Sequence, residues 1–274
     1  MKILFCTDLH GNRYYYDQLA SLASMAETDV VINGGDLLPK DGDLFDQGDF
    51  VTGFLAEHFA AINEAGIRYL CYLGNDDLRI FDNVFERTCE KYPLVTNLAQ
   101  RRTEIAGYEF IGMNWVVDYP FRLKDRCRID TPDHVFQPQL GTGLLSTCSG
   151  WQELPDWPSY ARTLPTIEDE LAKLPQPAAM DRAIYVIHMP PFGEGLDECW
   201  SGERVGSIAL SRFLEEKQPL YALHGHIHES PQVTGRWQAS IGRTTCIQPG
   251  QGPRFTYVTL DLESRSFHRT ACPL

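Results

Sequence analysis

The stretch KILFCTDLHGN, residues 2–12, decides the fold because an apolar strand runs directly into side chains that can bind a metal. Those side chains are Asp8, His10 and Asn12. A strand as apolar as this one is expected to be buried, and a buried charge needs a partner. A divalent cation suits an Asp that lies next to a His. We therefore expect further metal ligands downstream.

Composition and charge limit the class of protein. The chain has 274 residues, and its 43% hydrophobic content is typical of a soluble globular protein. Lys plus Arg total 24 against 37 Asp plus Glu, and the net charge of -13 repels phosphate backbones, so nucleic acid is not an expected partner. Asp8 interrupts the first apolar run before it reaches the length of a signal sequence or a membrane span. We expect a cytoplasmic protein without a membrane partner.

Apolar and amphipathic stretches alternate in the first third of the chain. Apolar runs at 2–6, 30–32 and 67–73 predict strands, and apolar residues at helical spacing predict helices at 14–27 and 50–64. The order strand, helix, strand, helix, strand is typical of a parallel sheet with crossover helices. We therefore predict an α/β fold.

The rest of the chain is more varied. Residues 103–113 predict a hairpin around Gly107, and residues 114–159, rich in Pro, Gly, Trp and Arg, predict an irregular insertion. Further predicted elements are helices at 166–174 and 206–216, strands at 183–187 and 220–223, and antiparallel strands at 240–247 and 255–262. No repeat or linker divides the chain, so we expect a single domain over residues 1–274.

Five predicted strands end at residues that can bind a metal. These residues are Asp8 with His10, Asp36, Asn75, His188, and His226 with His228. Because the carboxyl ends of parallel strands line one crevice, the residues can meet although they span most of the chain. Any one of them could simply cap a turn, but that explanation does not account for all of them together. The sequence therefore predicts a metal centre at this edge of the sheet.

The ligand set predicts two metal ions. Two Asp, one Asn and four His fill two sites of about four protein ligands each if one carboxylate bridges, which leaves positions for water and substrate. A mixture of nitrogen and oxygen donors suits divalent Mn, Fe, Zn or Co better than Ca or an all-oxygen Mg site. The sequence does not choose among these four metals.

The order of the motifs resembles the calcineurin-like metallophosphoesterase superfamily. The motifs are Asp8-x-His10-Gly11-Asn12, Gly35-Asp36, Gly74-Asn75-Asp76, His188 and Gly225-His226-x-His228. The stretches HMPP at 188–191 and GHIHES at 225–230 are similar to the phosphoesterases related to the Icc protein. The resemblance implies a two-sheet β-sandwich of mixed strands flanked by helices.

The resemblance also implies a division of the ligands between the metals. The first metal would be held by Asp8, His10, Asp36 and His228, and the second by Asp36 as a bridge with Asn75, His188 and His226. Two cations would neutralise the phosphoryl oxygens and lower the pKa of a bridging water, so that hydroxide attacks phosphorus in line with the leaving group. The expected reaction is hydrolysis of a phosphate ester, and the expected substrates are small phosphodiesters or nucleotides.

Two positions depart from the family pattern. Asp76 stands where many members have a His that is thought to protonate the leaving group. A carboxyl group acts as a general acid only if its pKa is raised, which burial favours and a cation opposes. Asp76 is therefore either the catalytic acid or a turn residue. The second departure is Gln248, where relatives commonly have Asn before Pro-Gly.

Substrate contacts are expected from three residues and from the insertion. Asn75 would contact the phosphate beside the second metal, and Asn12 would hold a substrate oxygen or serve a turn. The insertion also carries a basic cluster near the aromatic residues Trp115, Tyr119 and Phe121, made up of Arg122, Lys124, Arg126 and Arg128. This composition predicts either phosphate and ring contacts, with Arg122 foremost, or a solvated loop. We expect the 114–159 insertion to lie near the active site and to choose the substrate.

Two other functions remain open from the sequence. One is a non-catalytic metal-binding scaffold of the same fold, which Asp76 in place of the usual His suggests. The other is a nuclease, which would need a basic face that the acidic composition does not offer. The oligomeric state stays open.

Overall fold

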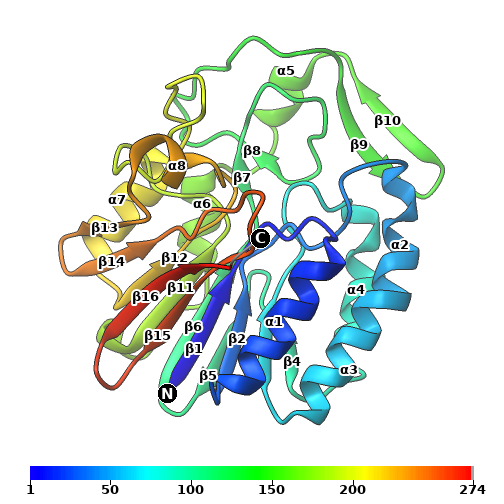
Figure 1. Ribbon diagram of the computed structural model, residues 1–274. Helices are drawn as coiled ribbons and strands as arrows, with labels where there is room; N and C mark the ends of the chain where they lie inside the picture. The colour runs from blue at the N-terminus through cyan, green and yellow to red at the C-terminus, as the bar shows by residue number, and fades with distance from the viewer. Residues whose placement is uncertain (273–274) are drawn as a thin grey trace.

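Two six-stranded sheets pack face to face, and helices cover their outer faces (Figure 1). The coordinates are a computed structural model, which describes residues 1–272. The strand order is β16-β15-β1-β2-β3-β4 in the first sheet and β13-β14-β12-β11-β6-β5 in the second. Both sheets contain parallel and antiparallel pairs. The predicted α/β fold, with two sheets of mixed strands flanked by helices, is therefore confirmed.

The first sheet is built from the two ends of the chain. Its parallel strands are β1 (Lys2–Cys6), β2 (Val30–Asn33), β3 (Arg68–Cys71) and β4 (Val95–Asn97), and β15 (Thr256–Asp261) and β16 (Ser266–Ala271) pair antiparallel at one edge. The long helices beside it are α1 (Arg13–Met25), α3 (Ala56–Glu64) and α4 (Asp82–Cys89). The helix predicted at 50–64 begins earlier, at α2 (Gln47–Phe50), and passes through one π-helical turn at Val51–Leu55 before α3. Apolar spacing does not distinguish an α-helical turn from a π-helical one.

The second sheet comes from the middle and the later part of the chain. Its strands are β5 (Arg102–Ile105), β6 (Tyr108–Met113), β11 (Ala183–Ile187), β12 (Tyr221–Leu223), β13 (Gln238–Ile241) and β14 (Thr244–Ile247). Its helices are α6 (Ile167–Lys173) and α7 (Ile208–Lys217), and the short α8 (Ser230–Thr234) follows β12. The predicted hairpin around Gly107 is present, with Ala106 and Gly107 both at positive φ, as a two-residue turn requires. Although β13 and β14 pair antiparallel as predicted, β14 also pairs parallel with β12.

Three apolar clusters hold the layers together. The cluster between the sheets includes Phe5, Phe110 and Ile184, which are fully buried. Each large apolar side chain that is fully buried stabilises the fold by about 1.5–3 kcal/mol. One further cluster lies between each sheet and its helices. This packing fixes the carboxyl ends of the parallel strands at one end of the molecule.

The predicted insertion lies over that end and contains regular elements (Figure 1). They are β7 (Val116–Val117) with β8 (Cys127–Arg128), β9 (Gly143–Thr147) with β10 (Gly150–Leu154), and α5 (Trp157–Ala161). The segment is therefore less irregular than its sequence predicts. No helix among residues 1–272 is long and apolar enough to cross a membrane.

Three basic residues of the insertion are buried, so neither a solvated loop nor a phosphate-binding cluster describes them. Lys124 donates to a carboxylate oxygen of Asp118 at 2.8 Å, and both side chains are inaccessible to solvent. Arg126 donates from Nε to the carbonyl of Gly74 at 2.7 Å, and the guanidinium of Arg128 lies 3.7 Å from the ring centre of Trp115. A buried cation requires such partners. Arg126 therefore ties the insertion to the body of the protein, while Lys124 and Arg128 hold parts of the insertion together.

Candidate metal centre

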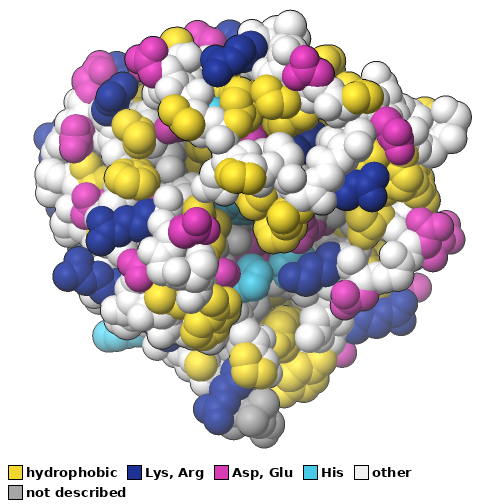
Figure 2. Space-filling view, turned by 90° about the horizontal axis from the view of Figure 1, so that it is seen from above, with side chains coloured by type: hydrophobic (Ala, Val, Ile, Leu, Met, Phe, Trp, Pro, Cys, Tyr) yellow, Lys and Arg dark blue, Asp and Glu magenta, His cyan; other side chains and the backbone are white. Residues whose placement is uncertain are grey.

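The predicted ligands follow strands that end at the same edge of the two sheets. Asp8 comes after β1, Asp36 after β2, Asn75 after β3, His188 directly after β11, and His226 and His228 after β12. Figure 2 looks onto this edge and shows histidine side chains at the floor of a hollow with apolar side chains around it. The parallel strands therefore bring together residues that are far apart in the sequence.

The first group consists of Asp8, His10 and Asp36. One potential ligand atom from each lies within 4.8 Å of the others. The ring of His228 lies 5.8 Å from the ring of His10. Oδ2 of Asp8 and both ring nitrogens of His10 are buried and have no hydrogen-bond partner among the described residues. Buried polar atoms are normally paired, so a cation is a fitting partner for Oδ2 of Asp8 and for one ring nitrogen of His10.

The second group gathers around Asn75. Its Oδ1 lies 2.9 Å from Nε2 of His188 and 2.6 Å from Nδ1 of His226. Asp36 lies between the groups, because its Oδ2 is 3.4 Å from Nε2 of His188 and 4.0 Å from Nε2 of His10. A carboxylate in this position can serve both groups.

The surroundings of His188 fit a cation. Nδ1 faces the carbonyl oxygen of Gly34 at 2.7 Å, so Nδ1 carries a proton. Nε2 then faces only acceptors, Oδ1 of Asn75 and Oδ2 of Asp36. Without a metal, the ring must bind a second proton: burial lowers its pKa, but the charge of Asp36 and a hydrogen bond to it raise the pKa to about 9. A metal on Nε2 satisfies the same atoms with a neutral ring.

The pKa values of His226 and Asp36 are lowered, in contrast to that of His188. Burial, and then the charge of His188, lower the pKa of His226 to about 3, so this ring is neutral and has a free lone pair to offer a metal. Burial raises the pKa of Asp36, but the charge of His188 and a hydrogen bond to it hold the pKa well below its usual range. Asp36 is therefore ionised, as a bridging ligand must be.

Four of the predicted ligands have a left-handed backbone. The φ angles are 56° at Asp8, 45° at His10, 52° at Asp36 and 68° at His226. Residues with a side chain rarely adopt this conformation, and where it occurs it costs about 1–3 kcal/mol each. Hydrogen bonds hold it, because the amide of Asp8 donates to the carbonyl of Gly35 and the amide of His226 donates to the carboxylate of Asp8. Strain concentrated on one edge is typical of a functional site.

Two glycines in the motifs allow a close approach of backbone and ligand. A Cβ on Gly74 would lie 2.2 Å from Oδ1 of Asp36, and a Cβ on Gly225 would lie 2.1 Å from Oγ1 of Thr7. A larger residue at either position would displace a ligand or the strand that carries it. The motifs therefore need glycine beside Asn75 and His226.

Asp76 lies at the rim of the second group. Burial, and then the charge of Asp36, raise its pKa to about 8. Its Oδ1 accepts from the side-chain amide of Asn75 at 2.9 Å, and its Oδ2 lies 3.8 Å from Nδ1 of His10. The neighbouring Asp77 is different, because its buried carboxylate accepts from the backbone amides of Leu37, Leu38 and Gly74 and holds that loop. Of the two, only Asp76 faces the cavity.

The two other predicted substrate contacts lie further out. Oδ1 of Asn12 accepts from the amide of Tyr15 at 3.3 Å and caps α1, although the residue also lines a pocket shared with His10 and His228. Arg122 is exposed, donates from Nε to the carbonyl of Thr142 at 3.2 Å, and does not line the main cavity. Their substrate-binding roles stay predictions.

Lys40 is a further residue at the site that was not predicted from the sequence. This lysine follows Asp36 by four residues and lines both the main cavity and the neighbouring pocket beside His10. It is exposed and lies near enough to Asp76 to lower the pKa of that carboxyl, against burial and Asp36. Its position in the same loop as the predicted ligand Asp36 could have indicated that it lies near the site. An ammonium here can pair with a phosphate oxygen.

Comparisons with known proteins agree with this fold. The structure aligns with the protein TT1561 of Thermus thermophilus at a TM-score of 0.59, with 19% identity over 98% of both chains. It aligns with a dimetal phosphatase from Danio rerio at a TM-score of 0.53, with 11% identity over 99% of this chain and 95% of the other. No curated protein matches the sequence significantly. A family model described as calcineurin-like phosphoesterase matches residues 1–230. The chain therefore belongs to the family of calcineurin-like phosphoesterases, which hydrolyse phosphate esters.

Proposed function

We propose that the protein hydrolyses small phosphodiesters or nucleotides at a centre of two divalent metal ions. The first ion would be held by Asp8, His10, Asp36 and His228, and the second by Asp36, Asn75, His188 and His226. The observation that carries this proposal is the position of Asp36, whose carboxylate lies between His10 and His188. The donor set suits Mn, Fe, Zn or Co.

The chain itself supplies several parts of the chemistry. When bound, the cations would neutralise phosphoryl charge and acidify a water for attack on phosphorus. The carbonyl of Gly34 keeps the ring of His188 in place through Nδ1. Lys40 would bind a phosphate oxygen at the mouth of the site. An ester held by both Lys40 and the metal centre would be positioned for reaction.

Asp76 would protonate the leaving group. Its carboxyl group faces the cavity, and the amide of Asn75 orients one of its oxygens. The proton would pass from the other oxygen to the ester oxygen as the bond to phosphorus breaks. Bound cations would lower the pKa of this carboxyl, whereas its burial and the charge of Asp36 raise it.

A reconstitution experiment tests the proposed activity. The purified protein is treated with a chelator, reloaded with Mn²⁺, and assayed with aryl phosphomonoesters, aryl phosphodiesters and cyclic nucleotides. We expect turnover that depends on the metal, and Asp36→Asn should lower kcat/KM by at least about 100-fold. The matched control Glu57→Gln removes a charge from an exposed position on α3 and should have no effect. Absence of turnover on every ester would refute the proposal.

A metal-binding scaffold without turnover is the second candidate. Asp76 in place of the usual His favours it, because loss of the proton donor would remove much of the rate. One measurement distinguishes the two functions. A scaffold would bind metal, but its rate of ester hydrolysis would be no higher than that of Asp36→Ala. A nuclease fits less well, because acidic side chains outnumber Lys40 and Arg204 around the cavity.

A further inference from the structure

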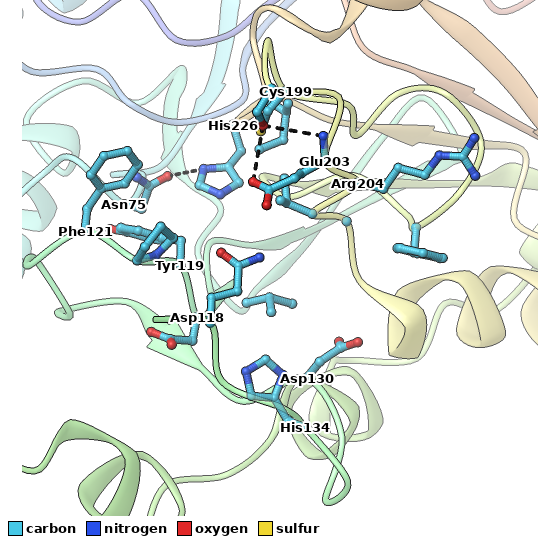
Figure 3. A pocket seen from close by; sticks show the side chains of 18 of the residues that line it. Asn75, Asp118, Tyr119, Phe121, Asp130, His134, Cys199, Glu203, Arg204 and His226 are labelled. Carbon is cyan, nitrogen blue, oxygen red and sulfur yellow. Dashed lines mark hydrogen bonds between the residues drawn. The ribbon is translucent and has the colours of Figure 1, made fainter. Parts of the chain in front are cut away.

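A cavity of about 870 Å³ extends from the predicted metal centre, far more space than a phosphate group requires. One wall comes from residues 117–137 of the insertion, and the other comes from residues 192–208, between β11 and α7. Figure 3 shows Asn75 and His226 at one end of this cavity and Asp130 and His134 at the other. The ester group attached to the phosphate therefore has room to enter between the two walls.

The walls present apolar side chains to solvent. Five large apolar residues that line the cavity are between 39% and 85% exposed: Phe121, Val135, Phe192, Trp200 and Ile208. They come from segments more than 50 residues apart in the chain but face one space. Exposed apolar side chains around one cavity are typical of a surface that binds an apolar group.

The buried acids in the walls are already paired. Asp118 accepts from Nζ of Lys124 at 2.8 Å and from the indole of Trp157 at 2.7 Å. Asp130 accepts from the hydroxyl of Ser207 and from the amide of Ile208 at the start of α7. These carboxylates stabilise the walls and do not need a ligand. These two carboxylates therefore do not require a hydrogen bond from a ligand.

The remaining charges disfavour a polyanion. Lys40 and Arg204 are the only cationic Lys or Arg side chains that line the cavity within the described residues, and the exposed carboxylates of Asp133 and Glu203 line it too. A second phosphate on the substrate would lie next to these carboxylates. The outer cavity thus suits a neutral group.

Tyr119 connects the metal centre to the apolar wall. Its ring lies 5.8 Å from the ring of His226 and 5.8 Å from the ring of Phe121. A chain or ring joined to a phosphate at the metal centre would pass along this aromatic surface. Each methylene that leaves water there contributes about 0.8 kcal/mol at most, which is roughly fourfold in affinity.

We propose that this cavity binds a large apolar ester group of the substrate, so that the enzyme prefers amphiphilic phosphodiesters to nucleotides and polyphosphates. The proposal rests on the proposed function, because it names the substrate class of the same site. It assigns the specificity to the apolar side chains on the two facing walls.

A series with one leaving group tests the preference. The substrates are p-nitrophenyl phosphodiesters whose second ester group is methyl, butyl, octyl or thymidine. Because p-nitrophenolate leaves in every case, differences in kcat/KM report on binding of the second group. We expect kcat/KM to rise about tenfold or more from methyl to butyl and to rise again for octyl. The thymidine ester should be a poorer substrate than the octyl ester.

Variants locate the effect. Val135→Ser and Trp200→Ser change exposed side chains on opposite walls, and each should lower the octyl-to-methyl ratio of kcat/KM by about threefold or more. The matched control is Met25→Ser, an exposed apolar residue at the end of α1 and outside the cavity, which should leave the ratio unchanged. Thermal unfolding of each variant verifies that it is folded.

The outcomes separate the two proposals. If no ester in the series is hydrolysed, the proposed phosphoesterase activity fails and the substrate class fails with it. If the methyl ester is hydrolysed but kcat/KM is flat or falls with chain length, only the apolar binding site is refuted. A thymidine ester that exceeds the octyl ester would assign the cavity to a nucleoside instead.

Discussion

Nε2 of His188 lies 3.4 Å from Oδ2 of Asp36, while Nδ1 of the same ring faces the carbonyl of Gly34 at 2.7 Å. The carbonyl fixes which nitrogen holds the proton, and the other nitrogen is left facing oxygen acceptors. A cation between His188 and Asp36 resolves this arrangement without a second proton. The relationship joins β2 of one sheet to β11 of the other at the proposed centre.

Asp76→Asn tests the proposed general acid. Asparagine has the same shape as Asp76 and can keep the contact with Asn75, but it cannot transfer a proton to the leaving group. We expect kcat to fall by about 10² to 10⁴ for an alkyl leaving group, which needs protonation, and to change little for p-nitrophenolate. Measurement of kcat for both ester types checks this. An equal loss with both leaving groups would show that Asp76 serves the structure of the site and not proton transfer.

Lys40→Ala tests the proposed contact between this ammonium and the phosphate. Loss of the ammonium should raise KM roughly tenfold with kcat changed less, because a charge-assisted contact to phosphate is lost from ground state and transition state alike. Lys40→Arg keeps the charge and should recover most of the affinity. Steady-state kinetics at low and high salt provide the measurement. An unchanged KM in Lys40→Ala would remove this residue from the substrate site.

We expect loss of the Lys124–Asp118 pair to destabilise the protein strongly. Lys124→Ala leaves Asp118 buried without its cation, so the free energy of unfolding should fall by about 3–5 kcal/mol. Arg122→Ala, two residues away and exposed, should change it by less than about 0.5 kcal/mol. Denaturant titration of both variants checks the contrast. Kinetics of Arg122→Ala on the same samples tests its predicted contact with substrate, which would appear as a raised KM.

We expect His58, on α3, to make the stability of the protein depend on pH. Burial lowers its pKa to about 4, from an ordinary 6.5, and its ring contacts the rings of Tyr16 and Tyr69. Because the unfolded chain binds the proton more readily, this contribution is fully present above about pH 6.5 and is lost as pH falls toward 4. The lost stability is about 3 kcal/mol.

The measurement is the free energy of unfolding across that pH range. His58→Phe should reduce the slope, and the exposed control His268→Gln should not. An identical slope in His58→Phe and the parent protein would contradict the assignment.

The sequence predicted the strands that carry the candidate ligands and the helices α1, α3, α6 and α7, because apolar periodicity and the order of elements are local signals. It did not predict α4, β4 or β16. It also predicted that Asp8, Asp36 and His188 would meet, since parallel strands share an edge. Their division between two metals stays a prediction. The left-handed backbone at Asp8 and Asp36 could not be predicted, because it is held by hydrogen bonds between strands distant in the sequence.

The burial of the basic residues in the insertion could not be predicted from the neighbouring sequence either. Lys124 and Arg126 look like solvated or phosphate-binding residues until their partners, Asp118 and the carbonyl of Gly74, are placed by the fold. Burial of a charge depends on such partners and not on its neighbours in sequence. For the same reason the role of Arg122 depends on how a substrate lies in the site.

Anomalous diffraction from crystals of the metal-loaded protein tests the central proposal most directly. We predict two peaks on either side of the Asp36 carboxylate, one within bonding distance of Asp8, His10 and His228, and one within bonding distance of Asn75, His188 and His226. A metal-loaded protein with no peak at Asp36, or with a single ion bound by other residues, would contradict the two-metal centre.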